Sequence, residues 1–248
     1  MRRTRHPAGN EEGTIMRIRT RNDLLTCGVV AVAMTGCTSG PAEPAASSAT
    51  GARALAGVPA EAPVEPGPYG FAVVDASQEH PVPLVTVPEG FAAMEDGIGV
   101  FRGDFDADDA QVLWIWDIDS VYTHPCEAGA TAAPVGPTVA DLAAALSAQP
   151  LREGTHPVPV TVGGYDGVYV ELSMPDDVDV DACPGGKFNS WPGRNQQGPG
   201  QVDMLWILDV DGQRMTFDAS ASRALGPDGL QVLTDMVTTT TFVPAEQG

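Results

Sequence analysis

Apolar residues between residues 69 and 244 recur in short runs and alternations that are typical of β-strands. Two runs, at 111–119 and 204–210, are mostly apolar and rich in β-branched and aromatic residues, which predicts buried strands. Further strands are predicted from the shorter segments 69–74, 82–87, 98–102, 158–162 and 168–172.

The run at 204–210 begins a predicted hairpin. Asp211-Gly212 follows it, and this pair tolerates the positive φ angles of a tight type I′ turn. Residues 214–220 then alternate, with Met215, Phe217 and Ala219 on one side and Thr216, Asp218 and Ser220 on the other. Since side chains alternate along a strand, this pattern predicts a half-buried return strand.

Two segments have helical spacing instead. Thr138 is a predicted N-cap with Asp141 three residues later, and the apolar residues that follow share one face until Pro150. A second helix is predicted from Pro227 to about Val237, followed by a last strand. Together these segments predict one α+β domain at 69–244, with a mainly antiparallel sheet of about seven or eight strands and two short helices, and a tail at 245–248.

The N-terminal segment has the features of an export signal. Residues 16–36 hold three arginines, then an apolar stretch containing Cys27 that is too short to span a bilayer, and they end in Met34-Thr35-Gly36 before Cys37. This order resembles the lipobox of bacterial lipoprotein signal peptides, except that leucine is usual where Met34 stands. The resemblance implies that Cys37 becomes a lipid-modified N-terminus, palmitate among its acyl chains, that holds the protein at the outer face of the plasma membrane.

The segments on either side of the signal are polar or simple in composition. Residues 1–15 fit no targeting segment, and we interpret them as a mis-assigned start ahead of Met16 or a disordered extension. Residues 37–68 consist largely of Ala, Pro, Ser, Gly and Glu, a composition that predicts a tether.

Charge narrows the classes of partner. The chain of 248 residues has a formal net charge of −20, and from Cys37 onward 7 Lys and Arg stand against 30 Asp and Glu, which gives −23. Such a surface repels nucleic acid, so a nucleic-acid partner is not expected.

Two cysteines remain outside the signal and the lipid site. Cys126 and Cys183 lie in predicted loops of an exported protein, which favours a disulfide that closes about 56 residues. The chain-entropy estimate for a loop of that size is roughly 4 kcal/mol. A metal site is the alternative, since His124 lies next to Pro125 and Cys126, but no C-x-x-C spacing supports it.

Three sequence stretches, at 163–172, 196–203 and 205–214, resemble a group of uncharacterised actinobacterial secreted and membrane-attached proteins. That resemblance implies no activity and no site residues. The order of lipobox, tether, strands and final hairpin, helix and strand is also similar to the Mog1/PsbP-like fold of LpqN-type lipoproteins. Because proteins of that fold tend to bind or assemble partners, this similarity implies binding more than catalysis.

The stretch from Cys183 to Gln201 contains the candidate binding site. It is long, rich in Gly and Pro, and concentrates cationic, aromatic and amide side chains on an acidic domain: Lys187, Phe188, Trp191, Arg194, Asn195, Gln196 and Gln197. The alternative interpretation is that Phe188 and Trp191 close the core. The tryptophans at 114, 116 and 206 lie inside predicted strands and are expected in the core or on a sheet face.

Catalytic and metal motifs are scarce. The sequence contains no G-x-S-x-G, H-E-x-x-H or phosphate-binding glycine motif, and no cofactor or catalytic residue is predicted. The acidic loop 103–109 begins like an EF-hand but has Asp109 where that loop needs Gly. We therefore expect a non-catalytic domain that binds an envelope protein or a small ligand. The alternatives are an envelope hydrolase built on His124, Ser190 and an aspartate, and a calcium-dependent structural module.

Overall fold

The computed structural model describes residues 52–105, 107–196, 198 and 200–244, with the side chain of Gln196 excepted. These residues belong to one compact unit, Ser47–Gly248. The signal segment, Cys27, Cys37 and the tail at 245–248 lie outside the described residues.

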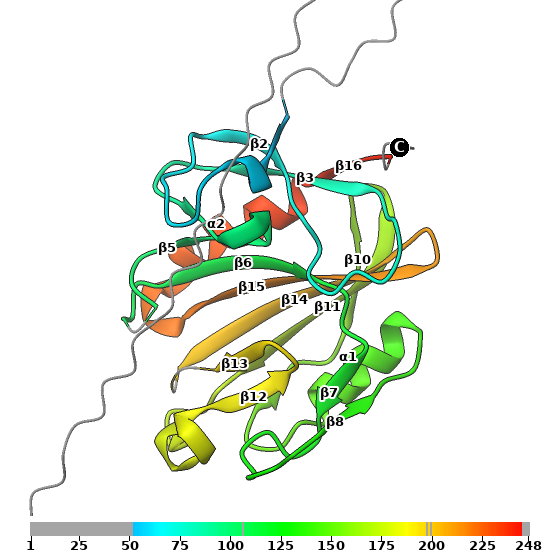
Figure 1. Ribbon diagram of the computed structural model, residues 1–248. Coiled ribbons are helices and arrows are strands. Elements are labelled where there is room, and N and C mark those ends of the chain that lie inside the picture. The colour runs from blue at the N-terminus through cyan, green and yellow to red at the C-terminus, as the bar shows by residue number, and fades with distance from the viewer. Residues whose placement is uncertain (1–51, 106, 197, 199, 245–248) are drawn as a thin grey trace, which may run out of the picture. The chain divides into compact units, whose positions relative to one another are not determined.

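The predicted α+β class is confirmed, since a mostly antiparallel sheet of eight strands packs with two helices in the described part of the chain (Figure 1). The helices are α1 (Val139–Ser147) and α2 (Gly226–Thr238). The central sheet has the order β10-β11-β14-β15-β6-β5-β4, with β9 paired to β11. Its strands are β4 (Ala92–Ala93), β5 (Gly99–Arg102), β6 (Gln111–Trp116), β9 (Glu153–Gly154), β10 (Val158–Val162), β11 (Tyr165–Ser173), β14 (Gln201–Val210) and β15 (Gln213–Ser222).

Three smaller sheets complete the domain. One has the order β1-β2-β3-β16, and the other two are the pairs β7-β8 and β12-β13. Their bounds are β1 (Arg53–Ala54), β2 (Gly67–Gly70), β3 (Val82–Val87), β7 (Ser120–Tyr122), β8 (Ala132–Pro134), β12 (Phe188–Trp191), β13 (Arg194–Gln196) and β16 (Thr241–Val243). Short 3-10 turns lie at Leu55–Gly57, Glu95–Gly97, Val180–Ala182, Pro184–Gly186 and Arg223–Leu225.

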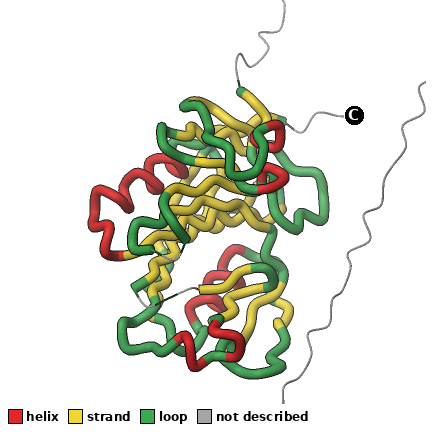
Figure 2. The backbone as a smooth tube through the Cα atoms, turned by 60° about the vertical axis from the view of Figure 1, so that its left-hand side comes forward, coloured by secondary structure: helices red, strands yellow, loops and turns green. Residues whose placement is uncertain are grey.

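The central sheet has a separate layer on each face (Figures 1 and 2). Helix α2 and the four-stranded sheet cover one face, where Phe217 and Trp206 pack with Leu233 of the helix. Helix α1 and the β12-β13 hairpin cover the other face, where Leu142 and Trp191 pack. Each face therefore has its own core, because strand alternation sends successive side chains of β14 and β15 to opposite sides.

The hairpin between β14 and β15 forms as predicted. Asp211 and Gly212 have φ angles of 53° and 83°, the positive values that the tight turn requires. The return strand differs from the prediction, however, because Thr216 and Asp218 on its supposed solvent side are fully buried. The physical reason is the second covering layer, which the alternation of β15 does not reveal.

Helix α1 begins as the sequence predicts. The Thr138 hydroxyl accepts a hydrogen bond from the Asp141 backbone N–H at 3.1 Å, and the Asp141 carboxylate accepts from the Thr138 backbone N–H at 3.0 Å. This reciprocal capping box satisfies amide groups that otherwise have no partner in the first helical turn.

The segment from residue 52 to 68 differs from the predicted tether. Leu55 is fully buried and Val64 is 4% exposed, and both belong to the core under the four-stranded sheet. The Arg53 guanidinium lies 4.3 Å from the centre of the Tyr69 ring. Ordered structure therefore begins before Tyr69, since this segment docks through buried apolar side chains and through backbone hydrogen bonds such as that from Val64 N–H to the Phe91 carbonyl at 2.8 Å.

Candidate functional site

The residues predicted to form a binding loop fold into the β12-β13 hairpin, which lies against the central sheet. Phe188, Trp191 and Arg194 are at most 4% exposed. Lys187 is exposed and Asn195 is half-buried, while Gln197 and the Gln196 side chain lie outside the described residues. The burial of both aromatic residues supports the alternative interpretation, in which they close the core, and they offer no exposed surface to a partner.

A network of buried charges joins this hairpin to the sheet. The Arg194 guanidinium donates through Nε to Asp218 Oδ2 at 2.7 Å and through Nη2 to Asp203 Oδ1 at 2.9 Å. Arg152, which follows α1, donates through Nη2 to Asp203 Oδ2 at 2.6 Å. Ser220 accepts from Arg194 Nη2 at 2.6 Å. Two arginines thus face two aspartates, so the network carries no net formal charge.

Burial and pairing shift the pKa values of this network in opposite directions. Burial lowers the pKa of Arg194, but the carboxylates of Asp218 and Asp203 outweigh it and raise the pKa above its ordinary value. Burial raises the pKa of Asp218, while Arg194 opposes that rise. The pKa of Arg152 is lowered by burial, with Asp203 acting against the shift. The charges of the two arginines are therefore largely neutralised by the carboxylates of Asp203 and Asp218.

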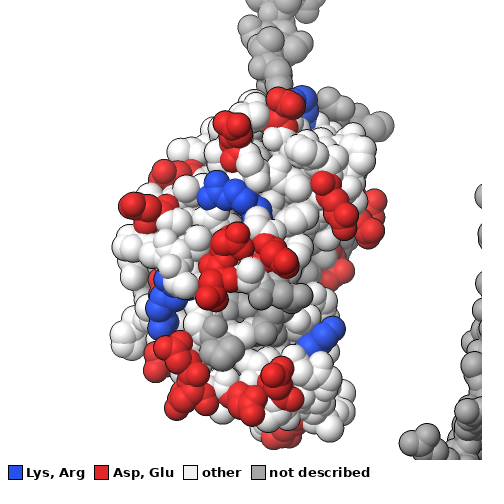
Figure 3. Space-filling view, turned by 90° about the vertical axis from the view of Figure 1, so that its left-hand side faces the viewer, with Lys and Arg blue, Asp and Glu red and all other residues white. Residues whose placement is uncertain are grey.

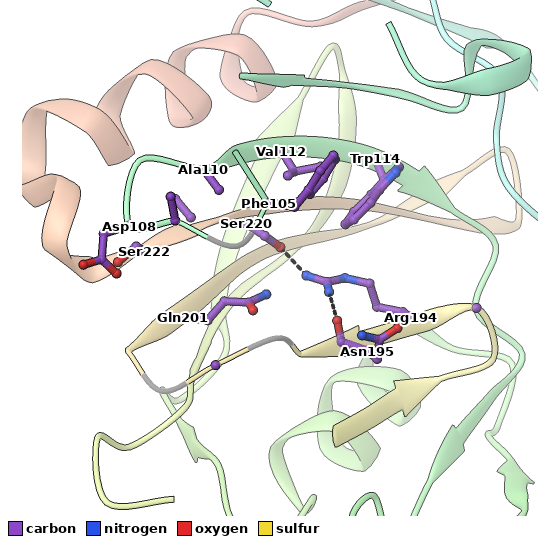
Figure 4. Close-up of a pocket in the computed structure, with 14 residues that line it drawn as sticks. Phe105, Asp108, Ala110, Val112, Trp114, Arg194, Asn195, Gln201, Ser220 and Ser222 are labelled. Carbon is purple, nitrogen blue, oxygen red and sulfur yellow. Dashed lines mark hydrogen bonds between the residues drawn. The ribbon is translucent and has the colours of Figure 1, made fainter. Parts of the chain in front are cut away.

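A groove of about 560 Å³ opens beside this network (Figure 4). Its first wall is the loop before β6 and β6 itself, and its second wall is the β13 side of the hairpin. The floor is formed by the start of β14 and the end of β15. The lining residues are Phe105, Ala107, Asp108, Ala110, Val112, Trp114, Gly193, Arg194, Asn195, Gly198, Gln201, Ser220, Ala221 and Ser222.

The two ends of the groove differ in chemistry. At one end Trp114 faces Arg194, whose guanidinium carbon lies 4.8 Å from the centre of the indole ring. Toward the other end, Asp108 and Ser222 line the groove (Figure 4). Phe105 is 37% exposed and stacks on Phe101 with 4.8 Å between ring centres. The groove thus offers aromatic surface at one end and a carboxylate at the other, with amides on its second wall and floor.

The predicted disulfide is confirmed. Cys126 and Cys183 are bonded, with 4.8 Å between their Cα atoms and a sequence separation of 57. Nearby, the Asn189 backbone N–H donates to the Pro125 carbonyl at 2.9 Å. The disulfide therefore fastens the segment leading into the hairpin to the chain that follows β7.

The residues of the hydrolase alternative lie in different environments. Ser190 is fully buried and its hydroxyl accepts from Arg152 Nη1 at 3.1 Å. The His124 side chain is 64% exposed and its Nδ1 lies 3.4 Å from Glu127 Oε1. A buried serine held by an arginine and an exposed histidine held by a glutamate do not make an accessible nucleophile and base.

The described residues contain no group of three or more His, Cys, Asp or Glu side chains arranged to hold a metal ion. Asp106 of the acidic loop is outside that set, so the calcium alternative stays a prediction. No helix in the described ranges has the length and hydropathy needed to cross a membrane.

A second hollow of about 550 Å³ lies at the start of α1. Arg214 borders it, but its guanidinium donates to the backbone carbonyls of Gly136 and Ile118 and so braces the loop before α1. Unlike the first groove, this hollow has no aromatic residue in its lining.

Comparisons with known proteins place limits on identity. No protein-family model and no curated protein matches the chain. A search of solved structures finds the crystal structure of LpqN, described as involved in cell envelope biogenesis of Mycobacterium tuberculosis. The match has a TM-score of 0.41 and 12% identity, and covers 73% of this chain and 91% of that chain. This similarity is too low to transfer a function.

Most of the groove was not found from the sequence. Of its lining, only Arg194 and Asn195 are among the predicted site residues, although Gly193, Gly198 and Gln201 lie in the same predicted stretch. Trp114 was expected in the core or on a sheet face, and it is half-buried on a face that the second layer leaves partly open. Phe105 carried a usable signal, because it is a large apolar residue within an acidic run. Ser220 and Ser222 carried none, since only the fold brings them to the groove.

Proposed function

We propose that this protein is anchored at the outer face of the plasma membrane through a lipid on Cys37 and that its domain binds a small ligand in the groove. The sequence features of residues 16–37 support the anchor. The observation that carries the binding proposal is the groove itself, a volume of about 560 Å³ with exposed aromatic surface and a few polar groups. Ligand pockets in proteins commonly have this size and mixture.

A small ligand is favoured over a protein partner for a specific reason. A flat protein-binding patch was expected to use Trp191 and Arg194 as anchors, but both are almost fully buried. The remaining exposed large apolar side chains in the described ranges, Phe105, Leu151 and Val158, lie on separate segments. Hot-spot residues for a protein partner usually cluster instead.

The test is to block the groove without disturbing the core. Ala107 is exposed and lines the groove, so Ala107→Trp should fill the space with an indole ring. Ala144 is exposed on α1, away from the groove lining, and Ala144→Trp is the matched control. Both variants should keep the thermal unfolding midpoint of the parent chain.

The full chain is purified from the membranes of its host, and small molecules released on denaturation are identified by mass spectrometry. We expect a molecule that accompanies the parent chain and Ala144→Trp but is depleted from Ala107→Trp. Equal amounts in all three samples, or no molecule in any, would contradict binding in the groove.

A further inference from the structure

The charges around the groove are unevenly distributed, and this distribution indicates the class of ligand. The inference about that class rests on the proposed function, binding in the groove. Its one fully buried cation is Arg194, which would normally attract an anion. That charge is already matched by Asp203 at 2.9 Å and Asp218 at 2.7 Å. A further anion would meet a guanidinium with two carboxylates beside it, so this end of the groove is suited to an uncharged part of a ligand.

The opposite end of the groove carries a carboxylate. Asp108 lines the groove and is exposed, and no hydrogen bond or ion pair to it is found among the residues described by the structure. The same loop contributes exposed carboxylates from Asp104 and Asp109. The aromatic ring of Phe105, three residues before Asp108, lies in the first wall.

A second acidic segment lies near the start of the groove floor. A Cβ atom added to Gly200 would lie 3.5 Å from Asp176 Oδ1, and Gly200 immediately precedes Gln201 of the groove floor. Asp176 and Asp177 are exposed. Figure 3 faces this side of the molecule and shows many acidic side chains with few basic ones. Two basic residues lie next to the groove lining: Arg223, exposed beside Ser222, and Arg102, whose Nε donates to the Gln111 side chain between Ala110 and Val112.

From this arrangement we infer that the groove selects a small organic cation, an amine with a flat apolar body. The ammonium group pairs with Asp108 at the open end, and the body lies along Phe105 toward Trp114. The carboxylate attracts the cation, and the aromatic surface of Phe105 and Trp114 packs against the flat body. The negative potential of the domain raises the local concentration of cations and lowers that of anions.

Three probes with one body and different charges test the inference. They are 3-phenylpropylamine, 3-phenylpropan-1-ol and 3-phenylpropanoate, titrated calorimetrically into the full chain in phosphatidylcholine nanodiscs, with empty nanodiscs subtracted. We expect the amine to bind roughly tenfold more tightly than the alcohol, and the carboxylate most weakly. The advantage of the amine should shrink as salt is added.

Two variants separate the local charge from the net charge. Asp108→Asn should bring the affinity for the amine to within roughly threefold of the affinity for the alcohol. Glu127→Gln removes the same charge from an exposed side chain that does not line the groove, and it should leave the preference unchanged. Equal effects of the two variants would overturn the assignment to Asp108.

The outcomes also distinguish this inference from the proposed function. If the carboxylate or the alcohol binds as tightly as the amine, and Ala107→Trp abolishes that binding, the groove binds ligands and the cation preference is wrong. If no probe binds and Ala107→Trp retains the same molecules as the parent chain, the proposed function itself fails.

Discussion

Arg194 and Asp218 form a buried ion pair between the hairpin and the central sheet, with 2.7 Å between Nε and Oδ2 and neither side chain more than 4% exposed. The pair lies directly behind the groove, because Arg194 belongs to both the network and the groove wall. The position of that wall therefore depends on the Arg194 charge, which is paired with Asp218 and almost fully shielded from solvent.

Removing the Arg194 guanidinium should destabilise the whole domain. Arg194→Leu would leave Asp218 buried without a cation, and breaking a buried pair in this way costs about 3–5 kcal/mol. Urea unfolding of the variant and the parent chain measures the difference. Lys187→Leu, at an exposed position of the same segment, should change stability by less than about 0.5 kcal/mol. A loss below about 1 kcal/mol for Arg194→Leu would show that the network contributes little net stability.

The sequence predicted which residues of β15 share a face, but not what covers each face. Alternation placed Thr216, Asp218 and Ser220 together correctly. Their burial depends on the β12-β13 hairpin, which comes from a stretch rich in Gly and Pro with no clear strand pattern. Arg194 and Trp191 were selected from this stretch as exposed anchors, because a cation and an aromatic residue in a polar loop give the same sequence signal whether they face solvent or the sheet.

The boundary of the domain shows a related limit. Composition over residues 37–68 predicts a tether because its average apolar content is low. This segment docks through single side chains, Leu55 and Val64, that enter a core formed by distant strands, and through backbone hydrogen bonds to Phe91 and Ala93. Some strand positions, by contrast, follow from local periodicity, and β3 and β10 begin and end at the predicted residues. The strand predicted at 69–74 is instead β2, which ends at Gly70, and β14 begins at Gln201, three residues before the predicted start.

Loss of the disulfide should destabilise the domain, because the unfolded chain then gains conformational entropy. Cys126 and Cys183 are 57 residues apart, and a loop of that size corresponds to roughly 4 kcal/mol in the chain-entropy account. The double variant Cys126→Ala and Cys183→Ala should lower the free energy of unfolding by about that amount. The same variant compared with the parent under reducing conditions is the control, and the two should then be equally stable. A parent chain unaffected by reduction would contradict the prediction.

Stability should fall at acid pH in part through the cap of α1. Hydrogen bonds from the Thr138 side chain and backbone lower the pKa of Asp141 below its ordinary value. A lowered folded-state pKa gives stability that is present above the unfolded value, about 3.9, and is lost as the pH falls through the folded value. Asp141→Asn should therefore reduce the urea midpoint near pH 7 and make less difference near pH 3.

The matched control for the helix cap is Asp235→Asn, on the exposed face of α2. It removes the same formal charge without touching the capping box. If the urea midpoint of Asp141→Asn is lower than that of the parent by the same amount from pH 7 to pH 3, the hydrogen bonds from Thr138 to Asp141 do not depend on the charge of the carboxylate.

Acylation at Cys37 gives the last prediction, and it concerns a position outside the described residues. If residues 16–36 are a lipoprotein signal, Cys37→Ala should remove both the acyl group and the cleavage site, because the thiol and the new N-terminus belong to the same residue. Metabolic labelling with palmitate and the intact mass of the membrane-bound protein measure both effects. Cys27→Ala is the control, since this cysteine lies within the apolar stretch of the signal and should leave labelling and cleavage unchanged. Retention of label by Cys37→Ala would place the acyl group elsewhere and remove the basis for the proposed anchor.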